Sequence, residues 1–180
     1  MKVQQKGNSM KIVILNGSPT PDGNTAALVN AFKEGAQSKG HEVTVLNVAH
    51  KKLNGCMSCG YCHAQGNGQC VQKDDMQEIY PLLMEAEMIT FASPIYYFTL
   101  SAQLQAVIQR FYAVNHPPKA KYSALLLSSY SPNVYTGAIA QYKDMIGYMG
   151  ITDKGIVTAD NSTNKTPAKL SEAKALGASL

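Results

Sequence analysis

The residues with the clearest chemical signature are four cysteines in one segment, Cys56, Cys59, Cys62 and Cys70, spaced C-x2-C-x2-C-x7-C. Thiolates bind soft metals, and three of them at x2 spacing match the start of the bacterial ferredoxin pattern. Zinc sites more often carry two C-x2-C pairs about 15–20 residues apart. The segment therefore predicts an iron–sulfur cluster, with a zinc ion or unligated, redox-active thiols as the alternatives. We interpret the neighbouring His63 as a loop residue rather than a ligand.

A polar segment over residues 16–25 carries a second set of candidate ligands. It follows an apolar run and precedes a helical pattern, and ligands of α/β sheets bind at this place, beyond the carboxyl end of a strand. The N–H groups of a helix N-terminus attract phosphate, and Ser18, Thr20, Asn24 and Thr25 add side-chain donors. The segment matches neither the Walker loop nor the dinucleotide fingerprint. It predicts a site for a terminal monophosphate or, in the simpler alternative, a polar turn in which Asn24 or Thr25 only caps the helix.

Aromatic residues follow the third apolar run, in the segment 93–98. In a sheet of order 2-1-3-4-5 this segment and the polar segment flank the point where the strand order reverses, which is where ligands bind. Tyr96, Tyr97 and Phe98 could cover a flat, conjugated ring there, and backbone N–H groups could reach its polar edge. In the alternative, they are core or interface aromatics. A third segment, 128–131, is expected at the other edge of the ring.

Strand-length apolar runs alternate with helix-length segments along the chain, which is the pattern of a parallel sheet with helices on both faces. Right-handed crossovers then follow. Strands are predicted at 11–15, 42–48, 88–92, 122–128 and 155–159, and helices at 25–39, 74–87, 100–114, 136–149 and 167–176. Pro81 predicts a kink or a late start in the second of these helices. The one long connection, 50–73, holds the cysteines, and loops of this length in compact domains are usually functional or disordered.

Several stretches of the sequence are similar to known flavoproteins. Gly17-Ser18-Pro19 with Gly23-Asn24-Thr25 resembles the phosphate loop of the NADPH-dependent FMN reductase and iron–sulfur flavoprotein families, in the flavodoxin-like superfamily. Ala92-Ser93-Pro94-Ile95-Tyr96-Tyr97 resembles their second flavin loop, and residues 103–110 resemble the helix after it. The cysteine run resembles the compact motif that holds a four-iron four-sulfur cluster in the iron–sulfur flavoproteins, with a final gap at the long end of its range. The likeness extends over roughly residues 10–160.

The resemblance implies a flavodoxin-like, doubly wound α/β fold. Its five-stranded parallel sheet would have the order 2-1-3-4-5, in one domain over residues 10–180 after a tail at 1–9. The resemblance also implies an FMN-dependent oxidoreductase with NAD(P)H as co-substrate and a quinone, a nitro compound or free flavin as acceptor. A ferredoxin-like carrier is a further expected partner, and the expected assembly is a homodimer or homotetramer. The residues expected to contact FMN are Ser18, Thr20, Gly23, Asn24, Thr25, Ala26, Pro94, Ile95, Tyr96, Tyr97, Phe98, Ser129 and Tyr130. The expected cluster ligands are Cys56, Cys59, Cys62 and Cys70.

Composition narrows the function classes further. The net charge is +4 without a basic cluster, so no nucleic-acid partner is expected, and no apolar run reaches the ~20 residues of a membrane span. No combination of His, Asp and Ser residues in the sequence indicates a hydrolase, and we assign no catalytic side chain. A non-catalytic electron carrier of the flavodoxin type is disfavoured because flavodoxins are usually strongly acidic. A zinc-holding flavin module is the third alternative. We expect a cytoplasmic protein, since the first ten residues lack the apolar region of a signal peptide.

Overall fold

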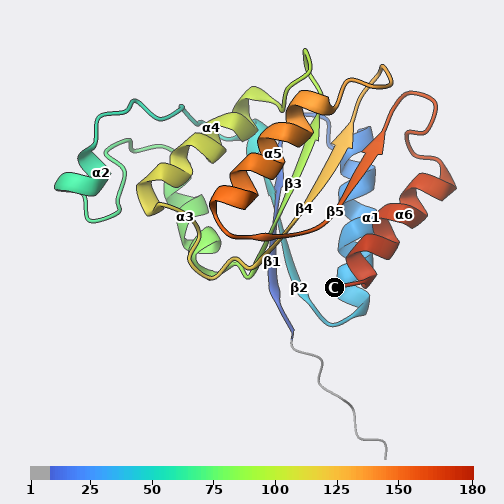
Figure 1. Cartoon of the computed structure of the whole chain (residues 1–180), viewed down its shortest axis with the longest axis horizontal. Helices are drawn as coiled ribbons and strands as arrows, with labels where there is room; N and C mark the ends of the chain where they lie inside the picture. Colours follow the sequence, from blue (N-terminus) through green and yellow to red (C-terminus); the bar gives the residue numbers. More distant parts are fainter. Residues whose placement is uncertain (1–8) are drawn as a thin grey trace, which may run out of the picture.

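The protein folds around a five-stranded sheet in which every neighbouring pair of strands is parallel, in the order β2-β1-β3-β4-β5 (Figure 1). A computed structural model describes residues 9–180. The strands are β1 Lys11–Asn16, β2 Glu42–Asn47, β3 Met88–Pro94, β4 Tyr122–Ser128 and β5 Thr152–Ala159. The helices are α1 Asn24–Ser38, α2 Tyr61–Ala64, α3 Met76–Glu85, α4 Ala102–Arg110, α5 Thr136–Tyr148 and α6 Pro167–Ala178, with 3-10 turns η1 Val48–His50 and η2 Phe111–Val114. The predicted flavodoxin-like fold and strand order are confirmed.

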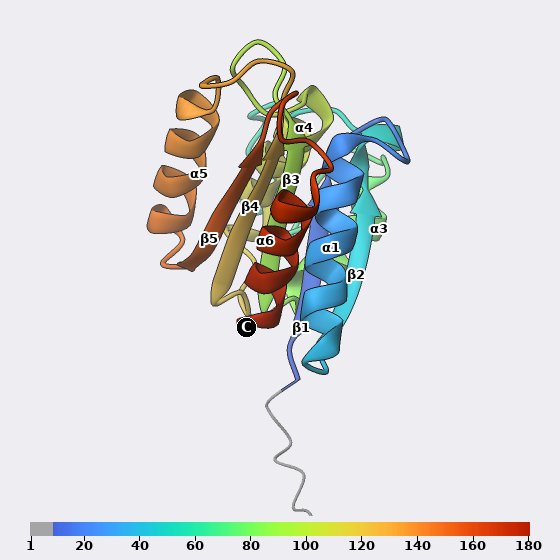
Figure 2. The same ribbon diagram turned by 90° about the vertical axis from the view of Figure 1, so that its right-hand side faces the viewer.

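The alternation of side chains along β1 shows why helices must cover both faces of the sheet. Ile12 and Ile14 point into one apolar cluster with Phe32 of α1, whereas Val13 and Leu15 point into another. Both sets are nearly inaccessible to solvent, as expected for a central parallel strand. In Figure 2, α1 and α6 lie together on one face of the sheet, and α5 lies on the other.

The helices α1 and α6 approach each other through glycines. A Cβ atom on Gly35 would lie 2.0 Å from the carbonyl oxygen of Lys174, and one on Gly177 would lie 2.1 Å from that of Phe32. Both obstacles are backbone atoms of the facing helix, which cannot rotate away. The two helices therefore pack at a distance that only glycine permits at these two positions.

Several predicted boundaries need correction. The helix predicted from Asp74 begins at Met76, because the carboxylates of Asp74 and Asp75 are used to bind the segment at 52–54 instead. Pro81 lies inside this helix and does not end it. The helix predicted over 100–114 is α4 followed by η2, and β5 begins at Thr152 instead of Gly155, with an irregular register opposite Ser123 and Leu125.

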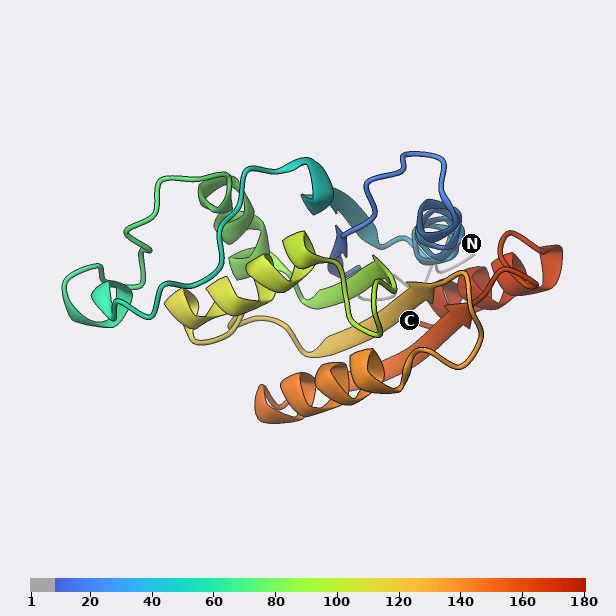
Figure 3. The same cartoon turned by 90° about the horizontal axis from the view of Figure 1, so that it is seen from above.

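The connection 50–73 is not wholly without structure, since it contains the short helix α2. Figures 1 and 3 show α2 at the outer edge of the molecule, on the side opposite α6. Of the expected tail 1–9, residues 1–8 lie outside the described residues, and the Ser9 hydroxyl donates to the Gly40 carbonyl at 2.7 Å. Among residues 9–180, no helix is both long and apolar enough to cross a bilayer.

Candidate functional site

The polar loop after β1 is shaped by its own side chains. Asn16 is buried, and its Oδ1 accepts from the Ser18 N–H at 3.1 Å while its Nδ2 donates to Asn47 Oδ1 at 3.0 Å. The Ser18 hydroxyl oxygen accepts from the Thr20 N–H at 3.4 Å. These bonds replace the regular ladder that ends at Asn16, so the loop enters α1 in a defined conformation.

The N-terminus of α1 has no side-chain cap. Its N-cap residue is Gly23, and neither Asn24 nor Thr25 bonds a backbone N–H of the first turn. The Thr25 hydroxyl is instead buried and lies 2.7 Å from the Ser128 hydroxyl at the end of β4. The simpler alternative, in which these residues only cap the helix, is therefore wrong. The first-turn N–H groups, which no helix can satisfy internally, remain directed at the carboxyl edge of the sheet.

The loop after β3 forms a narrow aromatic hairpin. Tyr96 and Thr99 exchange two backbone hydrogen bonds of 3.1 Å, and the Ile95 N–H donates to the Ser128 carbonyl at 2.8 Å. At the tip, Tyr97 and Phe98 have φ angles of 47° and 67°, the left-handed region that a two-residue turn of type I′ requires. Tyr97 is 97% exposed and Phe98 61%, so these aromatics do not belong to the core. Such strained residues concentrate at ligand sites.

The loop after β4 is bound more tightly to the protein than the sequence indicated. The Ser129 hydroxyl contacts the Ser131 carbonyl at 2.7 Å and the Tyr135 hydroxyl at 2.6 Å. Burial raises the pKa of Tyr135 although the hydrogen bond with Ser129 lowers it. Tyr130, in contrast, is exposed. Of the two residues predicted from this loop, Tyr130 therefore has a side chain that is free to contact a ligand, whereas the Ser129 hydroxyl is paired within the protein.

Sequence reasoning missed the loop after β5, which joins two of the predicted loops. The Lys165 Nζ donates to the Asp22 carbonyl of the first loop at 2.6 Å, and the Asn164 Nδ2 donates to the Ser129 carbonyl at 2.9 Å. Lys165 thus brings a positive charge to the loop that the sequence predicts to bind phosphate. Two signals were available: the segment 160–166 is rich in turn residues, and it follows a strand whose carboxyl end lies at the same edge as the others.

The four cysteines border one small cavity, together with Arg110. Cys62 is buried, Cys70 is half-buried, and Cys56 and Cys59 are exposed. As a donor set, four thiols without a carboxylate suit an iron–sulfur cluster or zinc. Within residues 9–180, however, no three His, Cys, Asp or Glu side chains lie in metal-ligand geometry. The composition of the site therefore fits a thiolate-bound group, and ligation would require the loop to tighten around it.

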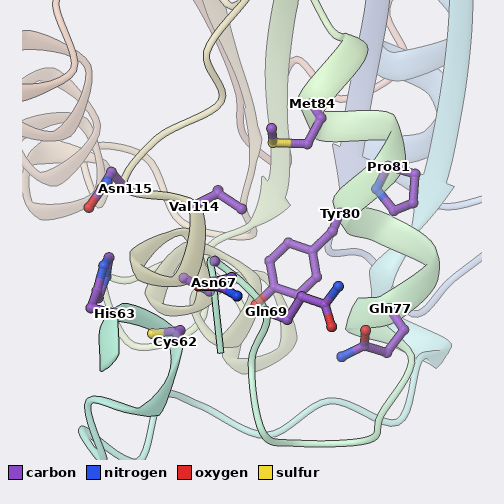
Figure 4. A pocket seen from close by; sticks show the side chains of 12 residues that line it. Cys62, His63, Asn67, Gln69, Gln77, Tyr80, Pro81, Met84, Val114 and Asn115 are labelled. Atoms are coloured by element: carbon purple, nitrogen blue, oxygen red, sulfur yellow. The ribbon is translucent and has the colours of Figure 1, made fainter. Parts of the chain in front are cut away.

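His63 lies in the short helix α2, not in a loop as predicted, and it does not border the cavity that the four cysteines line. Its Nε2 lies 2.7 Å from the Tyr112 carbonyl oxygen, and its ring meets the Tyr112 ring edge-on at 4.5 Å. Beyond it lies a cavity of about 650 Å³ between α2, α3 and η2, lined by Cys62, His63, Tyr80 and several amides (Figure 4). The cavity has no carboxylate, lysine or arginine in its wall, so it suits an uncharged ligand.

A buried ion pair anchors the cysteine loop. The guanidinium of Arg110 contacts both carboxylate oxygens of Asp74, at 2.7 and 3.1 Å. Burial would raise the pKa of Asp74, but the bonds from Arg110 and from the Asn54 and Met76 N–H groups outweigh it, so the pKa lies below its usual value. Burial raises the pKa of Tyr80, whose hydroxyl donates to the Arg110 carbonyl. Sequence reasoning missed this pair, because Arg110 lies inside the helix predicted over 100–114 and its partner Asp74 is 36 residues away in the chain.

The helix α4 brings the cysteine segment near the aromatic hairpin. A cavity of about 540 Å³ runs along it, from Tyr96 and Thr99 at one end to Gly55 and Gln109 at the other. The Gln109 side chain accepts from the Cys56 N–H at 3.3 Å. At a rise of 1.5 Å per residue, the nine residues of α4 span about 12 Å. The start of the cysteine run and the hairpin thus lie about one short helix apart.

Comparison with known proteins identifies the family. Residues 10–163 match the model of the family described as NADPH-dependent FMN reductase. The chain belongs to this family. An iron-sulfur flavoprotein of Archaeoglobus fulgidus is 35% identical to this FMN reductase family member over 142 residues, 78% of this chain and 60% of the relative. An iron-sulfur flavoprotein of Methanocaldococcus jannaschii is 37% identical over 101 residues, 56% of this chain and 51% of the relative. The chain therefore spans between half and two thirds of the length of these relatives.

Solved structures carry the same fold as this FMN reductase family member. RosB, whose structure holds 8-demethyl-8-formylriboflavin-5′-phosphate, matches 94% of this chain and 77% of its own with a TM-score of 0.76 at 13% identity. An azoreductase from Bacillus anthracis matches 95% of this chain and all of its own, with a TM-score of 0.69 at 16% identity. These identities are low, so the structural likeness shows the fold alone.

Proposed function

We propose that this protein is an FMN-dependent oxidoreductase that takes electrons from NAD(P)H or a ferredoxin-like carrier and passes them to a small acceptor such as a quinone. The observation that carries the proposal is the convergence of three loops on one edge of the sheet. They are the uncapped start of α1, the aromatic hairpin after β3, and the loop after β4. Ser128 contacts the first two, through its hydroxyl with Thr25 and through its carbonyl with the Ile95 N–H. Membership of the FMN reductase family supports FMN as the ligand of this edge.

Each loop has a separate task in this proposal. The first-turn N–H groups of α1, with the side chains of Ser18, Thr20 and Asn24, bind the phosphate, and Lys165 adds a positive charge nearby. Tyr96 and the hairpin tip cover the ring and exclude water from it. Bound FMN supplies hydride and single-electron chemistry, and the chain supplies orientation and electrostatics.

We propose a four-iron four-sulfur cluster as the group bound by Cys56, Cys59, Cys62 and Cys70. Two observations support it: the four thiols border one cavity, and two of the relatives at 35–37% identity are iron-sulfur flavoproteins. Placing this site at one end of α4 and the hairpin at the other would put two redox groups on one short helix. A zinc ion is the competing occupant, and metal analysis separates the two.

We further propose that the protein works as a homodimer or homotetramer. Tyr97, Phe98 and Tyr130, in the loops at the proposed FMN edge, are more than half exposed. Gathered exposed aromatics of this kind mark interaction surfaces. Light scattering of the holoprotein tests this point, and a monomer at micromolar concentration would refute it.

The FMN assignment is tested by titration with a matched pair of variants. Asn24→Leu changes an exposed residue in the first turn of α1, and Asn30→Leu makes the same change further along the same helix. We expect the first variant to weaken FMN binding at least tenfold, about 1.4 kcal/mol, and the second to leave it unchanged. Equal affinities in both variants would contradict the phosphate site.

The redox assignment is tested on protein purified without oxygen. We expect a flavin absorption spectrum, iron and sulfide in equal amounts, and oxidation of NADH or NADPH that depends on an added quinone. Replacing Cys59 with Ala should remove iron without removing FMN. Zinc in place of iron, with no turnover, would instead favour a zinc-holding flavin module.

A further inference from the structure

Among residues 9–180, Arg110 is the largest side chain that is completely buried. It is the last residue of α4, and its side chain is 1% exposed. An arginine keeps its charge under all ordinary conditions, and a charge is buried only where its partners compensate for lost water. What Arg110 contacts therefore indicates what it does.

The contacts of Arg110 join the two ends of the cysteine loop. Its guanidinium pairs with Asp74, which follows Cys70, and its Nη1 also donates to the Asn54 carbonyl at 3.1 Å, just before Cys56. The Asp74 carboxylate also accepts directly from the Asn54 N–H at 3.3 Å. Arg110 thus contacts both ends of the segment 54–74, which are also joined by the Asn54–Asp74 bond and by a bond from the Gln72 amide to the Gly55 carbonyl.

One nitrogen of this guanidinium, Nε, is buried and has no hydrogen-bond partner among residues 9–180. Arg110 also borders the cavity that all four cysteines line. The acceptors that a ligand of this cavity would offer are sulfur atoms, either thiolates or the sulfides of a cluster. An unpaired donor in a cavity wall is the feature expected where a bound group completes the hydrogen bonding.

We propose that Arg110 is the positioning residue of the cysteine site, closing the loop through Asp74 and donating its Nε–H to a sulfur of the group that the cysteines hold. This inference rests on the proposed function in one respect, namely that the cysteines bind a metal centre. Hydrogen bonds to cluster sulfurs are among the features that set the reduction potential. A donor at this place stabilises the reduced form, which carries one more negative charge, so the loss of the donor lowers the potential.

The first experiment measures iron, sulfide and the cluster midpoint potential in Arg110→Met, Arg110→Lys and the control Lys119→Met, all purified without oxygen. The control breaks an exposed ion pair, with Glu85, and leaves the cysteine loop untouched. We expect Arg110→Met to lose at least half of its iron and Arg110→Lys to keep iron with a more negative potential. Iron content and potential equal to those of the control in both variants would overturn the proposal.

The second experiment examines the loop in metal-free protein, through the rate at which a thiol reagent modifies Cys62. This thiol is 7% exposed, so rapid modification requires the loop to open. We expect at least a tenfold faster reaction in Arg110→Met and in Asp74→Asn than in Lys119→Met. Equal rates in all three would refute the closing role of Arg110. If Arg110→Met does not fold, Arg110→Lys and Asp74→Asn decide the question.

FMN titration of every variant separates this inference from the proposed function. Retained FMN shows that a loss of iron is local to the cysteine loop. A wild-type protein that binds neither iron nor zinc would refute the metal assignment and the Nε–H bond with it, while the thiol reaction would still decide the closing role. A protein that binds the cluster but no FMN would refute the proposed flavin function and leave the role of Arg110 intact.

Discussion

Replacing Gly17 with Ala tests how closely the phosphate loop must lie against α4. A Cβ atom at Gly17 would lie 2.2 Å from the Ser101 hydroxyl oxygen, 3.0 Å from the Leu104 Cβ and 3.5 Å from the Ala92 carbonyl oxygen. Its backbone conformation is one that alanine can adopt, so only the lack of space opposes the change. Overpacking of this kind costs about 1–3 kcal/mol.

Of the atoms that a Cβ at Gly17 would meet, the Ser101 hydroxyl can be removed by mutation, whereas the Leu104 Cβ cannot. The Ser101 hydroxyl is buried without a partner among the described residues, so Ser101→Ala should leave the free energy of unfolding within about 0.5 kcal/mol of wild type. The Leu104 Cβ is held in α4 and cannot move. We therefore expect Gly17→Ala with Ser101→Ala to recover more than half of the stability that Gly17→Ala alone loses.

Urea unfolding followed by circular dichroism gives the four free energies of this cycle, and FMN titration of the same proteins gives the affinities. Gly17→Ala should weaken FMN binding about tenfold for each 1.4 kcal/mol of binding free energy lost when the loop is displaced. The second substitution, Ser101→Ala, should restore part of this affinity. Purely additive effects, with no recovery in the double variant, would show that the loop does not rest against Ser101 as described.

Two further predictions concern stability. Gly147→Ala should raise the free energy of unfolding by about 0.5–1 kcal/mol, because the new methyl group on α5 meets open space. Gly35→Ala should lower it by at least about 1–3 kcal/mol, because its methyl group clashes with the Lys174 carbonyl. Chemical denaturation measures both changes, and changes of the same sign would contradict the helix packing. Asp74→Asn should lower the free energy of unfolding by about 3–5 kcal/mol at pH 7, because it removes one partner of a buried ion pair. Because the folded-state pKa of Asp74 lies below its usual value, this advantage of the wild type is present above about pH 4 and disappears as the pH falls through the folded pKa; a difference that stays constant down to pH 2 would contradict the pairing.

Much of the architecture follows from local patterns. The apolar runs at 11–15 and 122–128 coincide with β1 and β4 to within a residue, because a strand buried on both faces needs an uninterrupted apolar sequence. The helix α1 ends at Ser38, within one residue of the predicted end, just before Gly40 with its positive φ angle. The edge of the sheet at which the predicted ligand loops lie follows from the parallel strand order. The cysteine spacing likewise indicates thiolate chemistry from residue types and their separation alone.

The remaining features depend on contacts between residues far apart in the chain, which no local pattern contains. The Thr25 hydroxyl finds a partner in the Ser128 hydroxyl of β4, and the Ser129 hydroxyl finds partners in Ser131 and Tyr135, contacts that the sequence does not indicate. The sequence gives no sign that Arg110 is buried, but the fold places it against Asp74, 36 residues away, since a buried cation must be paired where it lies. Residue types and spacing predicted which residues are candidate ligands, and contacts between distant strands, loops and helices decided which of their polar groups are already paired within the protein.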